Sequence, residues 1–218
     1  MQLSILVPML VVWRRWRHFS PPVKLLSWYV YLSAAAAIGA RLLYPHYFAT
    51  NYGFLVGFNL GKVALFGAVY HQVLAPGPGR RVVAVATVAT LAGGVIAAAH
   101  DFELAVTISR VAQCAVLAGF ALAYLNELLN HASARPVAQD PLWLLSVGQL
   151  LYSAGVITAF SLDYLSATEI DNYVKFSFAS ISGLVFNYFL TLAFLRADPT
   201  SDPAPETKGQ PVDQLAGL

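Results

Sequence analysis

Long apolar runs separated by short polar breaks dominate the chain. Each run has about the 20 residues that an α-helix needs to cross a bilayer. The predicted spans are residues 1–20, 22–43, 52–75, 82–99, 105–129, 142–162 and 174–195. The pattern therefore predicts an all-α polytopic membrane protein, a bundle of seven transmembrane helices.

The breaks between the runs carry turn residues. Tyr44-Pro45-His46, Pro76-Gly77-Pro78-Gly79 and Arg135-Pro136 are typical of loops, because proline and glycine interrupt helices. Arginines follow the first run, whereas a secretory signal carries its charge before the apolar stretch, so we expect this run to be a retained span. The polar, proline-rich stretch 198–218 predicts a disordered cytoplasmic tail.

The run 82–99 consists almost entirely of Val, Ala, Gly and Thr, with Gly93-Gly94 near one end. Small residues let neighbouring helices approach closely. We therefore expect this helix to lie at the centre of the bundle and to carry no chemistry.

Composition narrows the class of protein further. Hydrophobic residues make up 58% of the chain and charged residues 11%, and the mean hydropathy is +0.62. Soluble domains have about 25% charged residues, so a soluble enzyme is excluded, and no nucleic-acid partner is expected. The single cysteine rules out an intramolecular disulfide.

The positions of the basic residues predict the orientation. With the N-terminus outside and the C-terminus inside, two basic residues face outward, Arg41 and Lys175. The inner face receives Arg14, Arg15, Arg17, Lys24, Arg80, Arg81, Arg135, Arg196 and Lys208. This bias follows the positive-inside rule and indicates a multi-pass protein of the cell membrane, the bacterial inner membrane in our interpretation.

Three ionisable residues remain inside the spans: Lys62, Arg110 and Glu127. Charges inside a membrane are costly and mark functional sites. Lys62 lies near the middle of its span, with Asn59 on the same face, and would anchor an anionic ligand or lipid headgroup, or move protons. The alternative is a structural lysine bonded to Asn59 and helix carbonyls.

Arg110 shares its helix face with Gln113, and either pairs with Glu103 or lines an outward pocket together with Lys62, with Asp163 as a competing partner. Later spans add polar stripes at helical spacing, which either line a cavity or bond helices together. The candidate ligand-binding residues are Lys62, Asn59, Arg110, Gln113, Gln149, Tyr152 and Asn187.

Glu127 and His131 lie one helical turn apart, and His71 ends another span on the same side. Carboxylate and imidazole groups bind transition metals, and two imidazoles bind haem. These three are weak metal candidates, so we expect no cofactor and assign no catalytic residue.

Two stretches of the sequence invite comparison with known protein families. Asp171-Asn172-Tyr173-Val174-Lys175 is similar to the retinal-lysine motif of rhodopsins, but Lys175 lies at a span end, which disfavours a retinal pigment. Asp140-Pro141 leading into Gly148-Gln149-Leu150-Leu151-Tyr152, with the run Tyr52 to Leu74, resembles small uncharacterised bacterial seven-helix membrane proteins. That resemblance implies a fold type. In that group we expect an acidic residue at the position that Lys62 occupies, so this chain departs from the pattern there.

The leading functional hypothesis is a sensor-like module that binds a small molecule or lipid without covalent chemistry. The alternative is a small transporter or channel for an anionic solute, using Lys62 and Arg110. The third is a lipid-modifying membrane enzyme using Glu127 and His131. The expected partners are the lipid bilayer, an anionic small molecule or lipid, and a protein partner or second copy of the chain.

Overall fold

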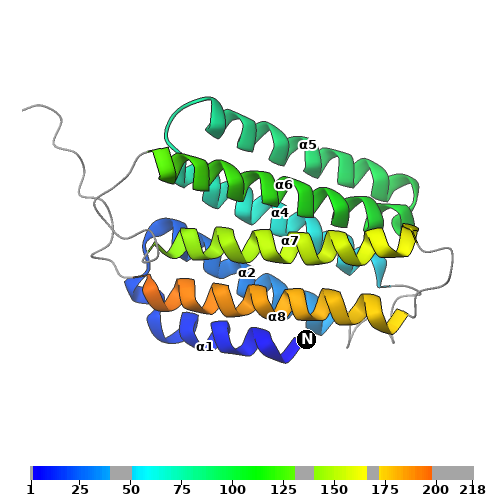
Figure 1. The fold of residues 1–218 in the computed structure, drawn as a ribbon, viewed down its shortest axis with the longest axis horizontal. Helices are drawn as coiled ribbons and strands as arrows, with labels where there is room; N and C mark the ends of the chain where they lie inside the picture. Colours follow the sequence, from blue (N-terminus) through cyan, green and yellow to red (C-terminus); the bar gives the residue numbers. More distant parts are fainter. Residues whose placement is uncertain (1, 40–50, 131–139, 166–171, 198–218) are drawn as a thin grey trace, which may run out of the picture.

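The computed structural model describes residues 2–39, 51–130, 140–165 and 172–197, and the regular structure in these residues is helical (Figure 1). Five helices are long and apolar enough to cross a membrane. They are α4 (Tyr52–Val73), α5 (Pro78–His100), α6 (Phe102–Asn130), α7 (Pro141–Leu165) and α8 (Asn172–Arg196). The chain is a multi-pass membrane protein, and the predicted all-α class is confirmed.

The N-terminal segment is broken into short pieces: η1 (Gln2–Ile5), α1 (Leu6–Arg15) and η2 (Trp16–His18). α1 has 10 residues and is about 15 Å long at the α-helical rise, half of a bilayer's hydrocarbon thickness of about 30 Å. Asn187, from the middle of α8, donates a hydrogen bond to the Ser4 hydroxyl at 2.8 Å. The start of the chain therefore packs at half the height of α8, and a first span stays a prediction.

α2 (Pro21–Ile38) begins at a pair of prolines. Ser20 is extended, with ψ of 158°, because a residue that precedes proline avoids the helical region. Pro21 and Pro22 then fill the first turn, where no N–H donor is needed. The helix has 18 residues, and the end of the predicted span, 40–43, lies outside the described residues.

The helices form a ring around an aromatic interior. α2 packs on α4, α4 on α6, α6 on α7 and α7 on α8, while α1 lies against both α8 and α2. Aromatic side chains reach α8 from the opposite side of the ring. The Tyr29 ring of α2 and the Phe186 ring have centres 5.6 Å apart, and Phe19, between η2 and α2, stacks on Phe194 at 5.5 Å.

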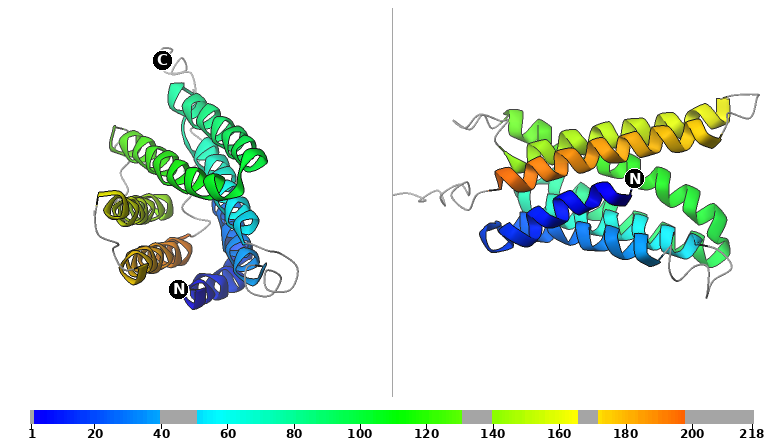
Figure 2. Two further views of the ribbon diagram at one scale, coloured as in Figure 1. Left: turned by 90° about the vertical axis from the view of Figure 1, so that its right-hand side faces the viewer. Right: turned by 90° about the horizontal axis from the view of Figure 1, so that it is seen from below.

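α5 is peripheral, so the expected central position for the run 82–99 is wrong. α5 contacts α4 and α6 on one side (Figure 2), and only 11% of its most apolar window is buried. Its small residues do allow close approach on that side, since a Cβ at Gly94 would lie 2.5 Å from the Leu60 side chain. The valines on its other faces, among them Val85 and Val88, are exposed.

α7 and α8 form the closest helix pair. A Cβ added at Gly148 would lie 2.6 Å from the Phe189 Cβ, and one at Gly155 would lie 1.9 Å from the Ser182 hydroxyl. Glycine at these two positions lets the helix backbones approach within a distance that a side chain would forbid.

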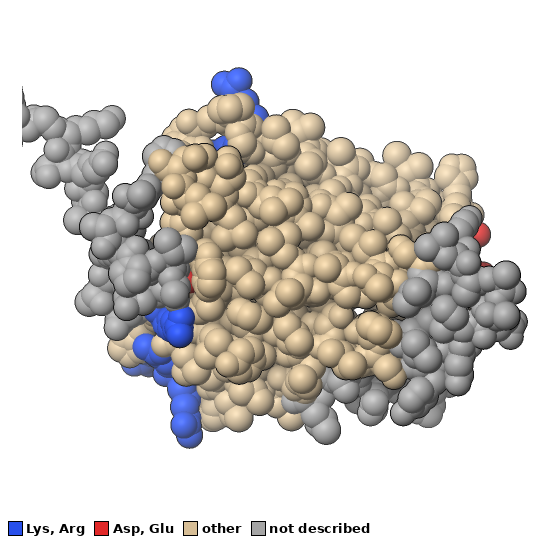
Figure 3. Space-filling model, in the orientation of Figure 1, with Lys and Arg blue, Asp and Glu red and all other residues tan. Residues whose placement is uncertain are grey.

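Charged side chains are sorted between the two ends of the bundle (Figure 3). Lys and Arg gather at the end where α1 and α8 finish and α5 begins, the end that carries Arg14, Arg80 and Arg196. Asp101 and Glu103 lie at the opposite end, in the corner between α5 and α6. The orientation of the bundle in the membrane stays a prediction. The predicted disordered tail, 198–218, lies outside the described residues.

Candidate functional site

Four aromatic rings enclose the ammonium group of Lys62. Its Nζ lies 4.0 Å from the ring centre of Tyr152, 4.4 Å from Phe186, 5.4 Å from Tyr29 and 5.5 Å from Phe66. The rings come from α7, α8, α2 and α4, so four helices converge on one side chain. Only 1% of Lys62 is exposed. We call Lys62 and these four rings the aromatic cage.

The cage provides the electrostatic environment that an anion would otherwise supply. A cation near the face of an aromatic ring is attracted by the ring quadrupole, by about 2 kcal/mol or more when both are removed from water. No hydrogen bond or ion pair joins the ammonium to another described residue. Lys62 is therefore enclosed by the protein's own side chains.

The structural alternative predicted a hydrogen bond between Lys62 and Asn59, and this bond does not form. The Asn59 amide donates instead to the Ser109 hydroxyl on α6, at 3.0 Å, and Ser109 donates to the Val106 carbonyl. This buried bond links α4 to α6 one helical turn from the cage, in the part of the bundle where Arg110 and Gln113 also lie.

Two buried glutamines leave polar atoms unpaired between α6 and α7. Both the Nε2 and Oε1 atoms of Gln113 lack a hydrogen-bond partner, and so does Oε1 of Gln149. The Gln149 amide donates to the Ser153 hydroxyl at 3.0 Å. The Tyr152 hydroxyl lies near Gln113. Buried polar atoms without partners are costly, and such positions hold water or the polar group of a ligand.

A cavity of about 500 Å³ lies between α6 and α7, and neither Gln113 nor Gln149 lines it. One stripe of α6 and one stripe of α7 line it: Thr107, Arg110, Val111 and Cys114, and Val156, Ile157, Phe160 and Ser161. The spacing within each set is that of a single helix face. Val111 and Ile157 are exposed, so the cavity opens on the outer surface of the bundle, and most of its wall is apolar.

Arg110 is the charged residue of this cavity. Its guanidinium lies 5.2 Å from the ring centre of Phe160. The predicted pair with Glu103 does not form, and no carboxylate of the described residues bonds to Arg110. The side chain of Asp163, the competing partner, is not among those described.

Cys114 connects the aromatic cage with the cavity. It lines the cavity, and its side chain interacts electrostatically with Lys62. Lys62 itself does not line the cavity. Of the predicted residues, the structure brings Lys62, Asn59, Arg110, Gln113, Gln149 and Tyr152 together where α4, α6 and α7 meet. Asn187 lies apart and bonds to Ser4 near α1.

Glu127, the third intramembrane charge, has a structural partner. Its Oε1 atom accepts a hydrogen bond from the backbone N–H of Ala75, just after α4, at 2.8 Å. His71 accepts one from Arg80 at 3.2 Å. His131 lies outside the described residues. Within the described part of the chain, no three His, Cys, Asp or Glu residues cluster as metal ligands would.

Of the four cage rings, only Tyr152 was among the predicted site residues; Phe66 was not, although it follows Lys62 by four residues and so shares its helix face. Tyr29 and Phe186 lie far from Lys62 in the sequence, and no spacing connects them. Phe160 and Cys114 likewise enter the site only through the packing of α6 on α7.

Comparison with family models, curated proteins and solved structures finds no match to this chain. The resemblance to small bacterial seven-helix membrane proteins therefore stays an expectation drawn from the sequence.

Proposed function

We propose that the protein is a sensor-like seven-helix module that binds an anionic small molecule or lipid in the cavity between α6 and α7. The observation that carries this proposal is Arg110, a membrane-embedded cation that lines an apolar cavity and bonds to no carboxylate of the described residues. A buried or half-buried charge needs a counterpart. A bound anion supplies it, and no covalent step is required.

The shape and chemistry of the cavity indicate the class of ligand. Apolar side chains such as Val111, Val156 and Ile157 suit a hydrocarbon body, while Arg110 suits a carboxylate or phosphate. Gln113, one turn from Arg110, has an unpaired buried amide, but it does not itself line the cavity. Because the cavity opens on the outer surface of the bundle, a ligand reaches it from the bilayer.

The transporter hypothesis has less support. It uses Lys62 and Arg110 as successive stations for an anion, but Lys62, Phe66 and Phe186 are almost fully buried against one another. This packing favours a binding site over a passage. Flux of chloride, phosphate or a small carboxylate into proteoliposomes, above the rate of empty vesicles, would instead favour transport.

We further propose the bacterial inner membrane as the location, with seven spans, the N-terminus outside and the C-terminus inside. The gathering of Lys and Arg at one end of the bundle supports this orientation, because basic residues concentrate on the cytoplasmic side.

Dansyl undecanoic acid provides a fluorescent test of the proposed site, with its methyl ester as the uncharged control. In nanodiscs, after subtraction of empty discs, the acid should bind with at least about tenfold preference over the ester, the difference that one charge-assisted hydrogen bond supplies. Arg110→Gln should remove that preference. Equal binding of acid and ester to the wild-type protein would refute an anion site.

A second pair of variants tests the position of the cavity. Ile157→Trp fills it, whereas Leu151→Trp adds the same ring to another exposed position of α7 outside the lining. Probe binding should be lost in Ile157→Trp and retained in Leu151→Trp. Native mass spectrometry of the protein purified from membranes would then identify the molecule that the cavity retains.

A further inference from the structure

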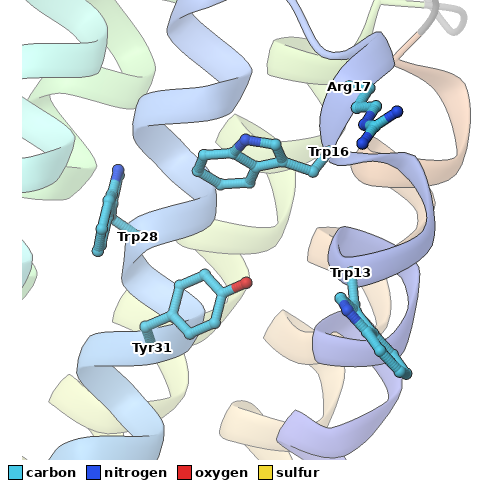
Figure 4. Close-up of a pocket in the computed structure, with 5 residues that line it drawn as sticks. All are labelled: Trp13, Trp16, Arg17, Trp28 and Tyr31. Atoms are coloured by element: carbon cyan, nitrogen blue, oxygen red, sulfur yellow. The ribbon is translucent and has the colours of Figure 1, made fainter.

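A second hollow lies on the outer surface between α1, η2 and α2 (Figure 4), whereas the Arg110 cavity is lined by α6 and α7. The second hollow has a volume of about 510 Å³, and Trp13, Trp16, Arg17, Trp28 and Tyr31 line it. The Trp16 indole meets Trp28 edge to face, with ring centres 6.2 Å apart, and Trp28 lies 5.8 Å from Tyr31. We call this hollow the tryptophan groove.

Two tryptophans of the tryptophan groove are largely exposed. Trp13 is 77% exposed and Trp28 is 55% exposed. Tryptophan concentrates at the boundary between lipid tails and headgroups, where the ring is in an apolar layer and its N–H finds an acceptor. η2, which carries Trp16 and Arg17, directly follows α1 at the end of the bundle where Lys and Arg gather, and the boundary is expected there.

The lining residues are ordered along the helix axis. Arg17 lies in η2, at the end of the bundle, while Tyr31 lies ten residues into α2, about 15 Å deeper at 1.5 Å per residue. Figure 4 shows the Tyr31 hydroxyl directed toward α1, below the Trp16 indole. From the end of the bundle inward, the groove thus offers a cation, then aromatic walls with N–H donors, then a hydroxyl.

Within the described residues, no ion pair neutralises the arginine of the tryptophan groove. The first 100 residues of the chain contain eight Lys or Arg and no Asp or Glu. Arg14 and Arg17 are exposed, and Arg17 makes no ion pair with another described residue. Indoles alone would also suit a choline group, but the neighbouring arginines repel a quaternary ammonium. The charge therefore favours a ligand with net negative charge.

We propose that the tryptophan groove binds an anionic phospholipid of the surrounding bilayer, with the phosphate at Arg17, the ester groups beside Trp16 and Tyr31, and an acyl chain along α2. This site is independent of the proposed Arg110 cavity. Bound lipid would hold the short α1 against α2 at a point where the two helices make few direct contacts.

Quenching by brominated lipids tests this proposal directly. The chain has four tryptophans, so Trp143→Phe leaves only the three in the groove as reporters. The protein is placed in phosphatidylcholine vesicles that contain brominated phosphatidylglycerol or brominated phosphatidylcholine. Quenching should show about fivefold stronger association of phosphatidylglycerol, the effect of one interfacial cation.

Arg17→Gln should reduce that preference to near one, whereas Arg81→Gln, which removes an exposed cation at the same end but on α5, should leave it unchanged. In the protein with Arg17 intact, high salt should weaken the preference through screening. Equal preference in Arg17→Gln and in its parent would overturn the proposal. Failure of any brominated lipid to quench would overturn it too, because another protein surface would then cover the groove.

Discussion

The Lys62 ammonium lies 4.0 Å from the centre of the Tyr152 ring. α4 and α7 meet through this contact, and Phe186 of α8 closes the cage from a third helix at 4.4 Å. The lysine thus fills the space between α2 and α4 on one side and α7 and α8 on the other. We infer that it acts as a central packing residue whose charge is stabilised by rings.

A double-mutant cycle measures this relationship. Replacing Tyr152 by Leu should lower the free energy of unfolding by about 0.5 to 2 kcal/mol more in the wild-type protein than in Lys62→Met. Only the wild-type protein has an ammonium group that loses its contact with the Tyr152 ring. Unfolding of the purified protein by sodium dodecyl sulfate in mixed micelles, followed by tryptophan fluorescence, gives the four values.

Tyr152→Phe is the matched control, since it keeps the ring and removes only the hydroxyl. Its coupling to Lys62→Met should be small compared with that of Tyr152→Leu. If the two cycles give equal coupling energies, the ring face does not stabilise the ammonium.

The apolar runs were sufficient to predict the helical class and the five long helices, because length and hydropathy are local properties of the sequence. The position of α5 was not predictable in the same way. Small residues such as Gly94 permit close approach, but they do not determine how many neighbours a helix has. The sequence alone does not distinguish a valine that faces lipid from one that packs against another helix.

The site was predictable only in part, for a related reason. Lys62, Arg110 and Glu127 stand out as charges inside apolar runs, yet the partner of each comes from a different helix or from the backbone. The Ala75 N–H bonds Glu127, aromatic rings surround Lys62, and Arg110 faces the cavity. Only tertiary packing separates a charge that the protein satisfies from one open to a ligand.

Gly148 is expected to be intolerant of a side chain. Gly148→Ala places a Cβ 2.6 Å from the Phe189 Cβ, an atom close to the backbone that cannot rotate away, so α7 and α8 must separate. The cost should be about 1 to 3 kcal/mol, as for other overpacked positions, measured by the same detergent titration.

Gly119→Ala is the control for that substitution. Gly119 is an exposed position of α6 where an added Cβ meets no atom within 4 Å, so its replacement should be neutral or stabilising by up to about 1 kcal/mol through helix propensity. Equal losses in the two variants would show that the close approach of α7 to α8 is not the cause.

Replacement of Gln113 should raise stability without affecting the cavity between α6 and α7. Gln113→Leu removes two buried polar atoms that lack partners, and should raise the free energy of unfolding by about 1 to 3 kcal/mol in the ligand-free protein. Because Gln113 does not line the cavity, the same variant should leave binding of dansyl undecanoic acid unchanged. Gln149→Leu loses the bond to Ser153 and should gain less stability. Destabilisation in Gln113→Leu would mean that an internal partner satisfies the amide.

The topology can be tested by cysteine labelling, because Cys114→Ala removes the single native thiol. In that background, Gln2→Cys and Glu103→Cys should react with a membrane-impermeant maleimide in intact spheroplasts. Lys208→Cys should react only after permeabilisation. This is the result for seven spans with the C-terminus inside.

The label at residue 2 is the decisive one, since it reports whether the number of spans is odd. α1 has only 10 residues, and Ser4 bonds to the middle of α8, so crossing requires the 3-10 turns on both sides of α1 to lengthen the segment. If Gln2→Cys and Lys208→Cys react from the same side while Glu103→Cys reacts from the other, the N-terminal segment does not cross. The bundle would then have six spans with both ends in the cytoplasm.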